Sequence, residues 1–315
     1  MRLFKNCQKV CVMRELIDFH AHLGDIFTGN NVSFRTGLVR PEDLGDCFAE
    51  NDRNGFTYTA QGKPAEELQE RMMAGQRRLQ FATCENIGRT LDKEGGVYSV
   101  LLPIYPYTSF EEYVAASRCD PRFIPFTSMD FSRPEKEIID KLRSDIEHGA
   151  KGLKLHPVIQ NRRLLDPIVL EAVELFGKAG LPVVTHVGKS NYYVRSQEEK
   201  YPTTIEFGAI EDFVELARTF PHYDLVAAHC CRNYPSALAE MTRGLDHVYT
   251  DTTFAGAAHI RETVDALGED RLLFGTDYPF SDMHYAALQV ELAFGENSDV
   301  AGKIFSGNAR RLLNL

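Results

Sequence analysis

Polar residues that can bind metal ions stand where short apolar runs of this sequence end. Residues 16–22 read LIDFHAH and end in His20 and His22. Three later runs each carry one such residue, namely His186 in LPVVTHVG, His229 in DLVAAHC and Asp277 in LLFGTDYP. Imidazoles and carboxylates hold Zn²⁺ and similar ions in open, reactive sites. Because they end successive strands, we expect them to share one pocket, and a metal-dependent enzyme is the leading prediction.

His20 and His22 are two residues apart, and this spacing places both side chains on the same face of a strand. Inside a barrel that face points at the axis, so both imidazoles can bind one ion. Asp18 falls on the same face, one step deeper, where it either orients a ligand or fills a polar layer.

His186 would supply a third nitrogen ligand and Asp277 an oxygen ligand. Three histidines and one aspartate suit Zn²⁺, and Mn²⁺, Fe²⁺ or Co²⁺ accept the same donors. Taken singly, His186 could be an ordinary core histidine and Asp277 a turn residue before Tyr278-Pro279. Together with the first two histidines, they predict one divalent metal ion, with zinc as the first choice.

Further polar residues end other apolar runs. His229 could be a further ligand, a general base or a donor to developing oxyanion charge, and we favour a catalytic role beside the metal. Lys154 and His156 share one face of the run 151–156, so we expect them to bind substrate. Lys154 could also bridge two metal ions if it were carboxylated, or fill a polar layer of a barrel. For Asp251 we predict a structural role.

Apolar runs and helical patterns alternate through most of the chain. Eight runs are candidate strands, over residues 16–21, 97–104, 123–129, 151–156, 181–186, 224–229, 247–252 and 272–276. Helical spacing fills residues 135–148, 166–179, 206–219, 235–243, 258–267, 282–294 and 299–313. This order predicts an α/β fold with a parallel sheet, a (β/α)₈ TIM barrel. The alternative, an open doubly wound sheet, would not bring eight strand ends around one centre, and no GxGxxG follows the first strand.

A long insertion, residues 24–96, interrupts this regularity between the first two strands. It begins with a loop-like stretch, carries a short helical patch near 41–50, and ends in a charged helix predicted over 64–93. In a barrel it would leave the rim where active sites lie, so we expect either a lid or a subunit contact. The rest of the sequence contains no linker, and residues 1–315 are predicted to form a single domain.

The composition is that of a globular protein, with 43% hydrophobic and 25% charged residues. The formal net charge of −10 argues against non-specific binding to nucleic acid or to an anionic membrane surface. No apolar run is long enough to span a membrane, and the N-terminus lacks the pattern of a signal peptide. Seven scattered cysteines indicate reduced thiols. We therefore expect a cytoplasmic protein with a small-molecule substrate; the sequence is compatible with a homo-oligomer.

Several motifs together resemble the amidohydrolase superfamily. They are IDFHAH, GLKLHP, VVTHVG, LVAAHC, LLFGTDYP and the closing IFSGNARRLLNL. The sequence is most similar to the amidohydrolase-related branch, which includes aminocarboxymuconate-semialdehyde decarboxylase and related metal-dependent hydrolases. The resemblance runs from Leu16 to the C-terminus and fades over the insertion at 24–96.

The resemblance implies a distorted (β/α)₈ barrel with one catalytic divalent metal, most often zinc. By motif, the ligands would be those on the first, fifth and eighth strands, His20, His22, His186 and Asp277. His229 matches a histidine that assists catalysis in members with one metal. Relatives with two metals carry a carboxylated lysine at the end of the fourth strand, whereas here Lys154 is followed by Leu155-His156-Pro157.

Three functions are compatible with these residues. The first is hydrolysis of an ester, lactone or amide-type bond by metal-activated water, with Asp277 as proton acceptor and His229 polarising the carbonyl. The second is non-oxidative decarboxylation of an unsaturated or aromatic acid, with Asp277 or His229 protonating the carbon that loses CO₂. That reaction needs a cation for the acid, and Arg195 with Tyr192 beside it is the candidate. The third is a non-catalytic metal-binding protein on the same scaffold.

Overall fold

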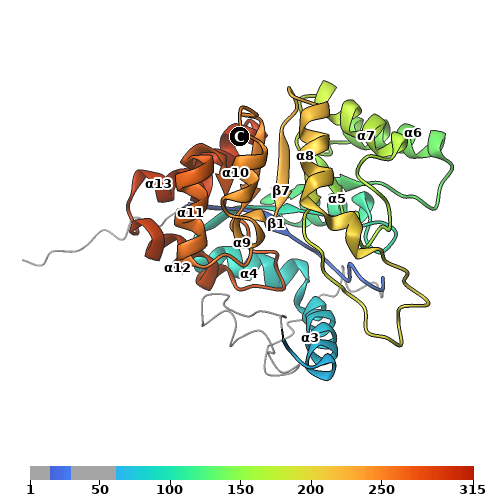
Figure 1. The fold of residues 1–315 in the computed structure, drawn as a ribbon, viewed down its shortest axis with the longest axis horizontal. Coiled ribbons are helices and arrows are strands. Elements are labelled where there is room, and N and C mark those ends of the chain that lie inside the picture. Colours follow the sequence, from blue (N-terminus) through green and yellow to red (C-terminus); the bar gives the residue numbers. More distant parts are fainter. Residues whose placement is uncertain (1–14, 30–61) are drawn as a thin grey trace, which may run out of the picture.

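Parallel strands alternate with helices in the part of the chain that the computed structural model describes, residues 15–29 and 62–315 (Figure 1). The strands are β1 (Leu16–Ala21), β2 (Gly96–Leu101), β3 (Phe123–Pro125), β4 (Thr127–Ser128), β5 (Leu153–Leu155), β6 (Val183–His186), β7 (Leu225–Ala228), β8 (Val248–Asp251) and β9 (Leu272–Leu273). They form one sheet in the order β1-β2-β3 and a second in the order β4-β5-β6-β7-β8-β9. Every strand pair is parallel, as predicted.

The two sheets are joined by one short stretch of backbone. Only Phe126 separates β3 from β4, and its N–H group donates to the carbonyl of Leu101 at 3.0 Å. The N–H group of Thr127 then donates to the carbonyl of Gly152, also at 3.0 Å. The predicted strand 123–129 is therefore one strand with a break, at which it changes its neighbour. The eight predicted strands correspond to nine observed strands, because the predicted strand 123–129 is divided into β3 and β4.

The first strand, β1, also contacts the segment that follows the last strand, β9. Phe19 donates its N–H to the carbonyl of Phe274 at 2.8 Å, and His22 donates to the carbonyl of Tyr278 at 2.8 Å. Ala21 forms a parallel bridge with Tyr278. These bonds place β1 beside the segment that follows β9, which is the neighbour relation that a (β/α)₈ barrel requires.

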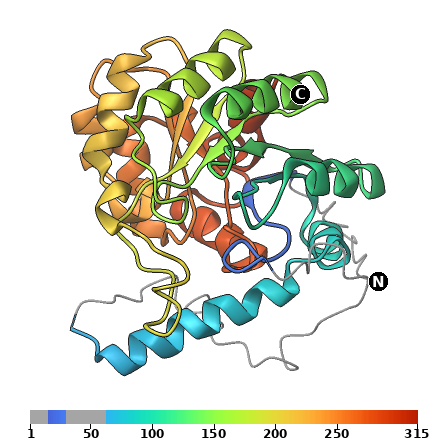
Figure 2. The ribbon, with the colours of Figure 1, turned by 90° about the vertical axis from the view of Figure 1, so that its right-hand side faces the viewer.

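Helices cover the outside of the strands (Figure 2). The α-helices are α3 (Ala65–Arg78), α4 (Cys84–Glu94), α5 (Phe110–Cys119), α6 (Glu135–Glu147), α7 (Pro167–Lys178), α8 (Ile210–Thr219), α9 (Cys230–Asn233), α10 (Ala237–Met241), α11 (Ala257–Leu267), α12 (Met283–Phe294), α13 (Asp299–Gly302) and α14 (Asn308–Leu313). Short 3₁₀ turns are η1 (Leu79–Phe81), η2 (Ile205–Gly208) and η3 (Glu269–Arg271), and a π-helical turn, η4 (Lys303–Gly307), joins α13 to α14.

Two helices have no counterpart among the predicted ones, α5 and the four-residue α9. α5 begins with a capping box, in which the Ser109 hydroxyl accepts from the Glu112 N–H at 3.3 Å. The Glu112 carboxylate in turn accepts from the Ser109 N–H at 2.8 Å. This S-x-x-E pattern is the sequence signal that identifies the start of α5.

The described part of the insertion contains two helices where one charged helix is predicted over 64–93. α3 and α4 are separated because Thr83 adopts an extended backbone and caps α4, accepting from the Asn86 N–H at 3.2 Å. A threonine in that position ends the preceding helical path and starts a new one. The helical patch predicted at 41–50 lies outside the described residues.

Buried apolar side chains lie on both sides of the strands, as parallel sheets require. One cluster draws its members from β1, β2, β3, β6, β7 and β9, including Phe19, Val226 and Leu273. Strands so far apart in the chain share one cluster because they surround a common centre. A second cluster joins β5, β6 and β7 to helices α6, α7 and α8. Within the described residues, no helix combines the length and apolar character needed to cross a membrane.

The join between the two sheets leads to a prediction about stability. A Cβ atom on Gly152 would lie 2.2 Å from Cε2 of the fully buried Phe126 ring. We expect Gly152→Ala to displace this ring and lower the free energy of unfolding by about 1–3 kcal/mol, measured by urea denaturation. Gly302→Ala is the control, because its Cβ would meet nothing within 4 Å in a helix. It should leave stability unchanged or raise it by up to about 1 kcal/mol; equal losses in both variants would contradict this account.

Candidate metal centre

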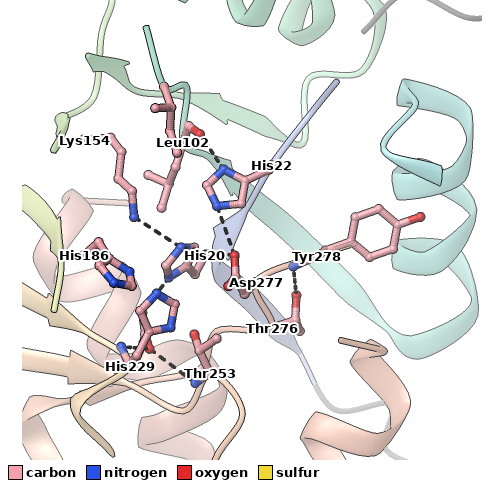
Figure 3. Close-up of polar contacts among 12 residues, drawn as sticks. His20, His22, Leu102, Lys154, His186, His229, Thr253, Thr276, Asp277 and Tyr278 are labelled. Carbon is pink, nitrogen blue, oxygen red and sulfur yellow. Dashed lines mark hydrogen bonds and ion pairs between the residues drawn. The ribbon is translucent and has the colours of Figure 1, made fainter. Parts of the chain in front are cut away.

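The end of β1 and the segment after β9 place three potential metal ligands side by side (Figure 3). His20 and His22 are 0% and 2% exposed, and their ring centroids are 5.2 Å apart. Asp277 is held against β1 because its N–H group donates to the His20 carbonyl at 2.7 Å. Its Oδ1 lies 3.0 Å from His22 Nε2 and 3.5 Å from His20 Nε2. One donor atom from each residue thus lies within 4.8 Å of the others.

Hydrogen bonds on the far side of each ring determine which nitrogen faces the centre. His20 Nδ1 lies 2.8 Å from Asp251 Oδ2, and His22 Nδ1 lies 2.7 Å from the Leu102 carbonyl. Both partners are acceptors, so both Nδ1 atoms carry the proton and both Nε2 atoms present a lone pair. Burial lowers the pKa of His20 and of His22, which favours the neutral form of both rings.

The charge of Asp277 completes the argument for a cation. Burial alone would raise the pKa of its carboxyl group, but the neighbouring His20 and His22 rings hold that pKa well below its usual range. An ionised carboxylate therefore faces the Nε2 atoms of two buried histidines. Such an arrangement needs positive charge among the three atoms, which either a proton on Nε2 or a bound cation supplies. The donor set fits a divalent ion such as Zn²⁺.

Asp251 links this centre to His229. Besides accepting from His20, its carboxylate accepts from the His229 N–H at 3.0 Å. The His229 ring centroid lies 5.0 Å from that of His20, and its Nδ1 is buried without a hydrogen-bond partner among the described residues. Burial lowers the pKa of His229 to about 4, so the ring is neutral at pH 7. Asp251, predicted to be structural, orients two site histidines; its place at the end of β8 is the sequence signal for that role.

Lys154 contributes a buried positive charge from β5. Its side chain is 0% exposed, and Nζ lies 3.3 Å from His20 Nε2. Burial lowers the pKa of Lys154 to about 8, although the carboxylates of Asp277 and Asp251 oppose the shift. Lys154 is therefore mostly protonated at pH 7 and places a positive charge at the bottom of the site.

His186 and His156 lie together on the other side of the centre. Their rings stack at 4.2 Å with an angle of 6° between the planes. His186 Nε2 lies 3.0 Å from the Gly188 carbonyl and 2.9 Å from the Tyr192 hydroxyl. Its ring centroid is 4.8 Å from that of His229, yet His186 is not part of the close group formed by His20, His22 and Asp277. Its role as a third histidine ligand stays a prediction.

A cavity of about 540 Å³ opens onto these residues. The predicted site residues that line it are His20, His22, Lys154, His156, His186, Tyr192, His229 and Asp277. The widely separated ends of β1, β5, β6, β7 and β9 thus contribute to one concave site.

The sequence and the fold both match known proteins over nearly the whole chain. The model of the family described as Amidohydrolase (Amidohydro_2) matches residues 17–315. The chain belongs to the amidohydrolase family. This finding confirms the resemblance that the strand-end motifs carry, and such enzymes depend on a metal ion. A search of curated proteins found no significant match.

Solved structures with the same fold confirm that this amidohydrolase is a TIM-barrel protein. An uncharacterised TIM-barrel protein from Bordetella bronchiseptica is 18% identical, with a TM-score of 0.68 over 95% of this chain and 98% of that one. The 5-carboxyvanillate decarboxylase of Sphingomonas paucimobilis is 17% identical, with a TM-score of 0.58 over 96% and 99%. The 4-oxalomesaconate hydratase of Rhodopseudomonas palustris is 17% identical, with a TM-score of 0.57 over 95% of each chain.

One predicted substrate-binding residue of the amidohydrolase does not line the cavity. Arg195 is exposed, and its backbone N–H donates to Gln69 Oε1 at 2.9 Å. Arg71 of α3 and Arg232 of α9 line the cavity instead. Neither arginine is predicted from the sequence, because α9 is too short to give a periodic pattern and nothing in the spacing of the insertion places α3 at the site.

The hydrogen bond between Asp251 and His20 leads to a prediction about metal affinity. In Asp251→Asn, one carboxylate oxygen becomes an NH₂ group that faces either His20 Nδ1 or the His229 N–H. We expect metal affinity to fall about 10- to 100-fold, because the histidine ligand loses its orienting partner. Competition with a chromophoric zinc chelator measures this change in the purified amidohydrolase.

Asp145→Asn is the matched control for this substitution. Asp145 is also buried, but it accepts from Thr127 Oγ1 and Lys141 Nζ, away from the cavity. It should alter stability and leave metal affinity within about twofold of the wild type. Equal affinities in the Asp251 variant and the wild type would show that Asp251 does not orient a ligand.

Proposed function

We propose that this chain is a metal-dependent decarboxylase of a small unsaturated or aromatic carboxylic acid. The observation that supports this proposal is the charge balance of the cavity. Among the described residues that line it, Lys154, Arg71 and Arg232 are cationic, whereas Asp277 is the one carboxylate. The histidines around it are neutral at pH 7. A cavity with this surplus of positive charge attracts an anionic substrate.

Aromatic side chains in the same cavity favour a planar substrate. Phe27 lies 5.5 Å from Tyr192 and 5.6 Å from Phe280, measured between ring centroids, and all three line the cavity. Phe254 adds a fourth ring, 6.0 Å from His229. Flat rings can stack on such walls, which adds to the attraction between the acid and the cationic groups.

The residues that would hold the metal are His20, His22 and Asp277, with His186 as the expected third nitrogen ligand. When bound, the divalent ion supplies Lewis acidity at the bottom of the cavity. The ammonium group of Lys154 would bind the substrate carboxylate beside it. The bond from the carboxylate carbon then breaks, CO₂ leaves, and the electron pair stays on the remaining carbon.

That carbon needs a proton, and Asp277 and His229 are the candidates to deliver it. The low pKa of Asp277 makes its protonated form a strong acid, which would have to receive its proton from the substrate or from water. His229 is neutral at pH 7 and would donate a hydrogen bond to a substrate oxygen or pass on a proton. Both side chains line the cavity next to His20.

Hydrolysis of an ester, lactone or amide is the second candidate. Its support is the ionised Asp277 carboxylate beside two histidine lone pairs, since this group can accept a proton from an attacking water molecule. The names of the structural relatives do not decide between the two, because one is a decarboxylase and another a hydratase. The third function, metal binding without catalysis, predicts no turnover at all.

The decarboxylase proposal is tested by CO₂ release from a panel of aromatic and unsaturated acids. We expect CO₂ from at least one acid, loss of activity after treatment with a chelator, and recovery when a divalent metal is added back. Asp277→Asn should lower kcat by about 100-fold or more, because it removes a proton-transfer group. The control is Asp246→Asn, a substitution of an exposed aspartate that should leave kcat unchanged.

Other outcomes point to the remaining functions. Turnover of esters, lactones or amides without CO₂ from any acid would favour hydrolysis. A metal-loaded protein that turns over neither panel would favour the non-catalytic function. Near-normal turnover by Asp277→Asn on a substrate of either class would exclude Asp277 as the proton-transfer group.

A further inference from the structure

A fully buried tyrosine of α5, Tyr113, contacts the backbone beside the metal centre. Its side chain is 0% exposed and belongs to an apolar cluster with members from β1, β2, α4 and α12. Tyr113 is not among the described residues that line the cavity. Any effect of its hydroxyl group on the site is therefore transmitted through the residues that it contacts.

The start of α5 determines where the Tyr113 ring points. The capping box of Ser109 and Glu112 fixes the first turn, and the Tyr113 N–H donates to the Ser109 carbonyl at 3.3 Å. The buried residues of α5 are Phe110, Tyr113 and Ala116, spaced three apart on one face. The cap thus sets the register that turns the phenol toward the barrel.

The Tyr113 hydroxyl group bonds both backbone groups of Leu23. It donates to the Leu23 carbonyl at 2.9 Å and accepts from the Leu23 N–H at 3.1 Å. Leu23 is 0% exposed and lies two residues beyond the end of β1, outside the ladder of strand bonds. Buried peptide groups need partners, so the phenol provides here what a neighbouring strand provides within a sheet.

The same hydroxyl oxygen lies close to the carbonyl that orients His22. Leu23 directly follows His22 in the chain. On the other side of the phenol, the Leu102 carbonyl lies 3.4 Å from the Tyr113 oxygen and 2.7 Å from His22 Nδ1 (Figure 3). One phenol oxygen therefore contacts both the residue after this expected metal ligand and the group that fixes the direction of its ring.

The end of β2 is attached to the same region. The Leu102 N–H donates to the Ala21 carbonyl at 2.9 Å. Thr108, just before α5, has its Oγ1 3.5 Å from the Tyr113 oxygen, and this Oγ1 accepts from the Ile104 N–H at 2.9 Å. The ends of β1 and β2 and the loop that leads into α5 thus meet at the phenol.

We propose that Tyr113 is a positioning residue for the metal centre, which holds His22 with its Nε2 atom toward Asp277. The proposal rests on the metal centre and not on the proposed reaction, so it applies equally to a decarboxylase and to a hydrolase. Partners that orient a histidine ligand typically change metal affinity 10- to 100-fold. Tyr113 acts one contact further from the ligand, and we expect an effect at the lower end of this range.

The zinc affinity of Tyr113→Phe tests this role, because the substitution removes one oxygen atom and keeps the ring. The full-length protein, stripped of metal, would compete with a chromophoric chelator for Zn²⁺. We expect the dissociation constant for zinc to rise about 10-fold, because the Leu23 backbone loses both partners and His22 loses its fixed position. Thermal unfolding should also occur at a lower temperature.

Tyr193→Phe is the matched control. Tyr193 is also 0% exposed, and its hydroxyl group donates to the Phe27 carbonyl at 2.9 Å. Loss of this bond should lower thermal stability and leave zinc affinity within about twofold of the wild type. The proposal is overturned if Tyr113→Phe binds zinc as the wild type does, or if both variants lose affinity equally.

A Co²⁺ spectrum decides the case in which metal-free Tyr113→Phe is too unstable for the competition. At saturating Co²⁺, visible absorption depends on the arrangement of the ligands and not on the stability of the metal-free protein. We expect an altered spectrum in Tyr113→Phe and the wild-type spectrum in Tyr193→Phe. Identical spectra in all three proteins would overturn the proposal.

The outcomes also separate this proposal from the proposed function. A wild-type protein that binds no zinc would overturn the metal centre and the role of Tyr113 together. Zinc binding that depends on Tyr113, without CO₂ release from any acid, would retain the role of Tyr113 and remove the decarboxylase. Metal-dependent CO₂ release with unchanged zinc affinity in Tyr113→Phe would do the reverse.

Discussion

The site depends on a buried carboxylate that needs positive charge beside it. His20 Nδ1 and His22 Nδ1 face Asp251 and the Leu102 carbonyl, so both Nε2 atoms point toward Asp277. The three residues are at most 8% exposed. Burial strengthens the interaction of the carboxylate with any positive charge among these atoms, because little solvent is present to screen it. Metal affinity therefore follows from the fold, which determines the direction of every lone pair.

The backbone is strained at two residues whose side chains belong to the site. His229 and Asp277 both have positive φ angles, 68° and 57°, although neither is glycine. Such conformations persist only where the surrounding structure compensates for their cost, and they concentrate at functional sites. Here the compensation is visible: the Asp277 N–H bonds the His20 carbonyl, and the His229 N–H bonds Asp251. His229 directly follows β7, and Asp277 lies four residues after the end of β9; both side chains line the cavity.

The sequence predicts the chemical centre better than it predicts the substrate-facing wall. His20, His22 and Asp277 are recognisable because they end apolar runs, and parallel strands must bring such ends together. Arg71 could not be assigned, because its position depends on amide contacts between α3 and a loop more than a hundred residues away. Arg195 appears suitable by type and spacing, yet its side chain is exposed and outside the cavity. Strand periodicity predicts the positions of His20, His22 and Asp277. The position of Arg71 depends instead on pairwise contacts between long polar side chains.

The cavity thus has two parts that are held in different ways. The side chains expected to bind the metal lie at the end of β1 and after β9, each strand pairing with one neighbour in its sheet, and backbone bonds join the two segments. The part of the wall that α3 contributes is attached through glutamine side chains and one arginine. No backbone bond shown joins α3 to His20, His22 or Asp277, so we expect substitutions in α3 to alter the cavity wall while the geometry of these three residues stays the same. In an enzyme of this architecture, the wall that contacts the substrate can then change without disturbing the buried charges at the strand ends.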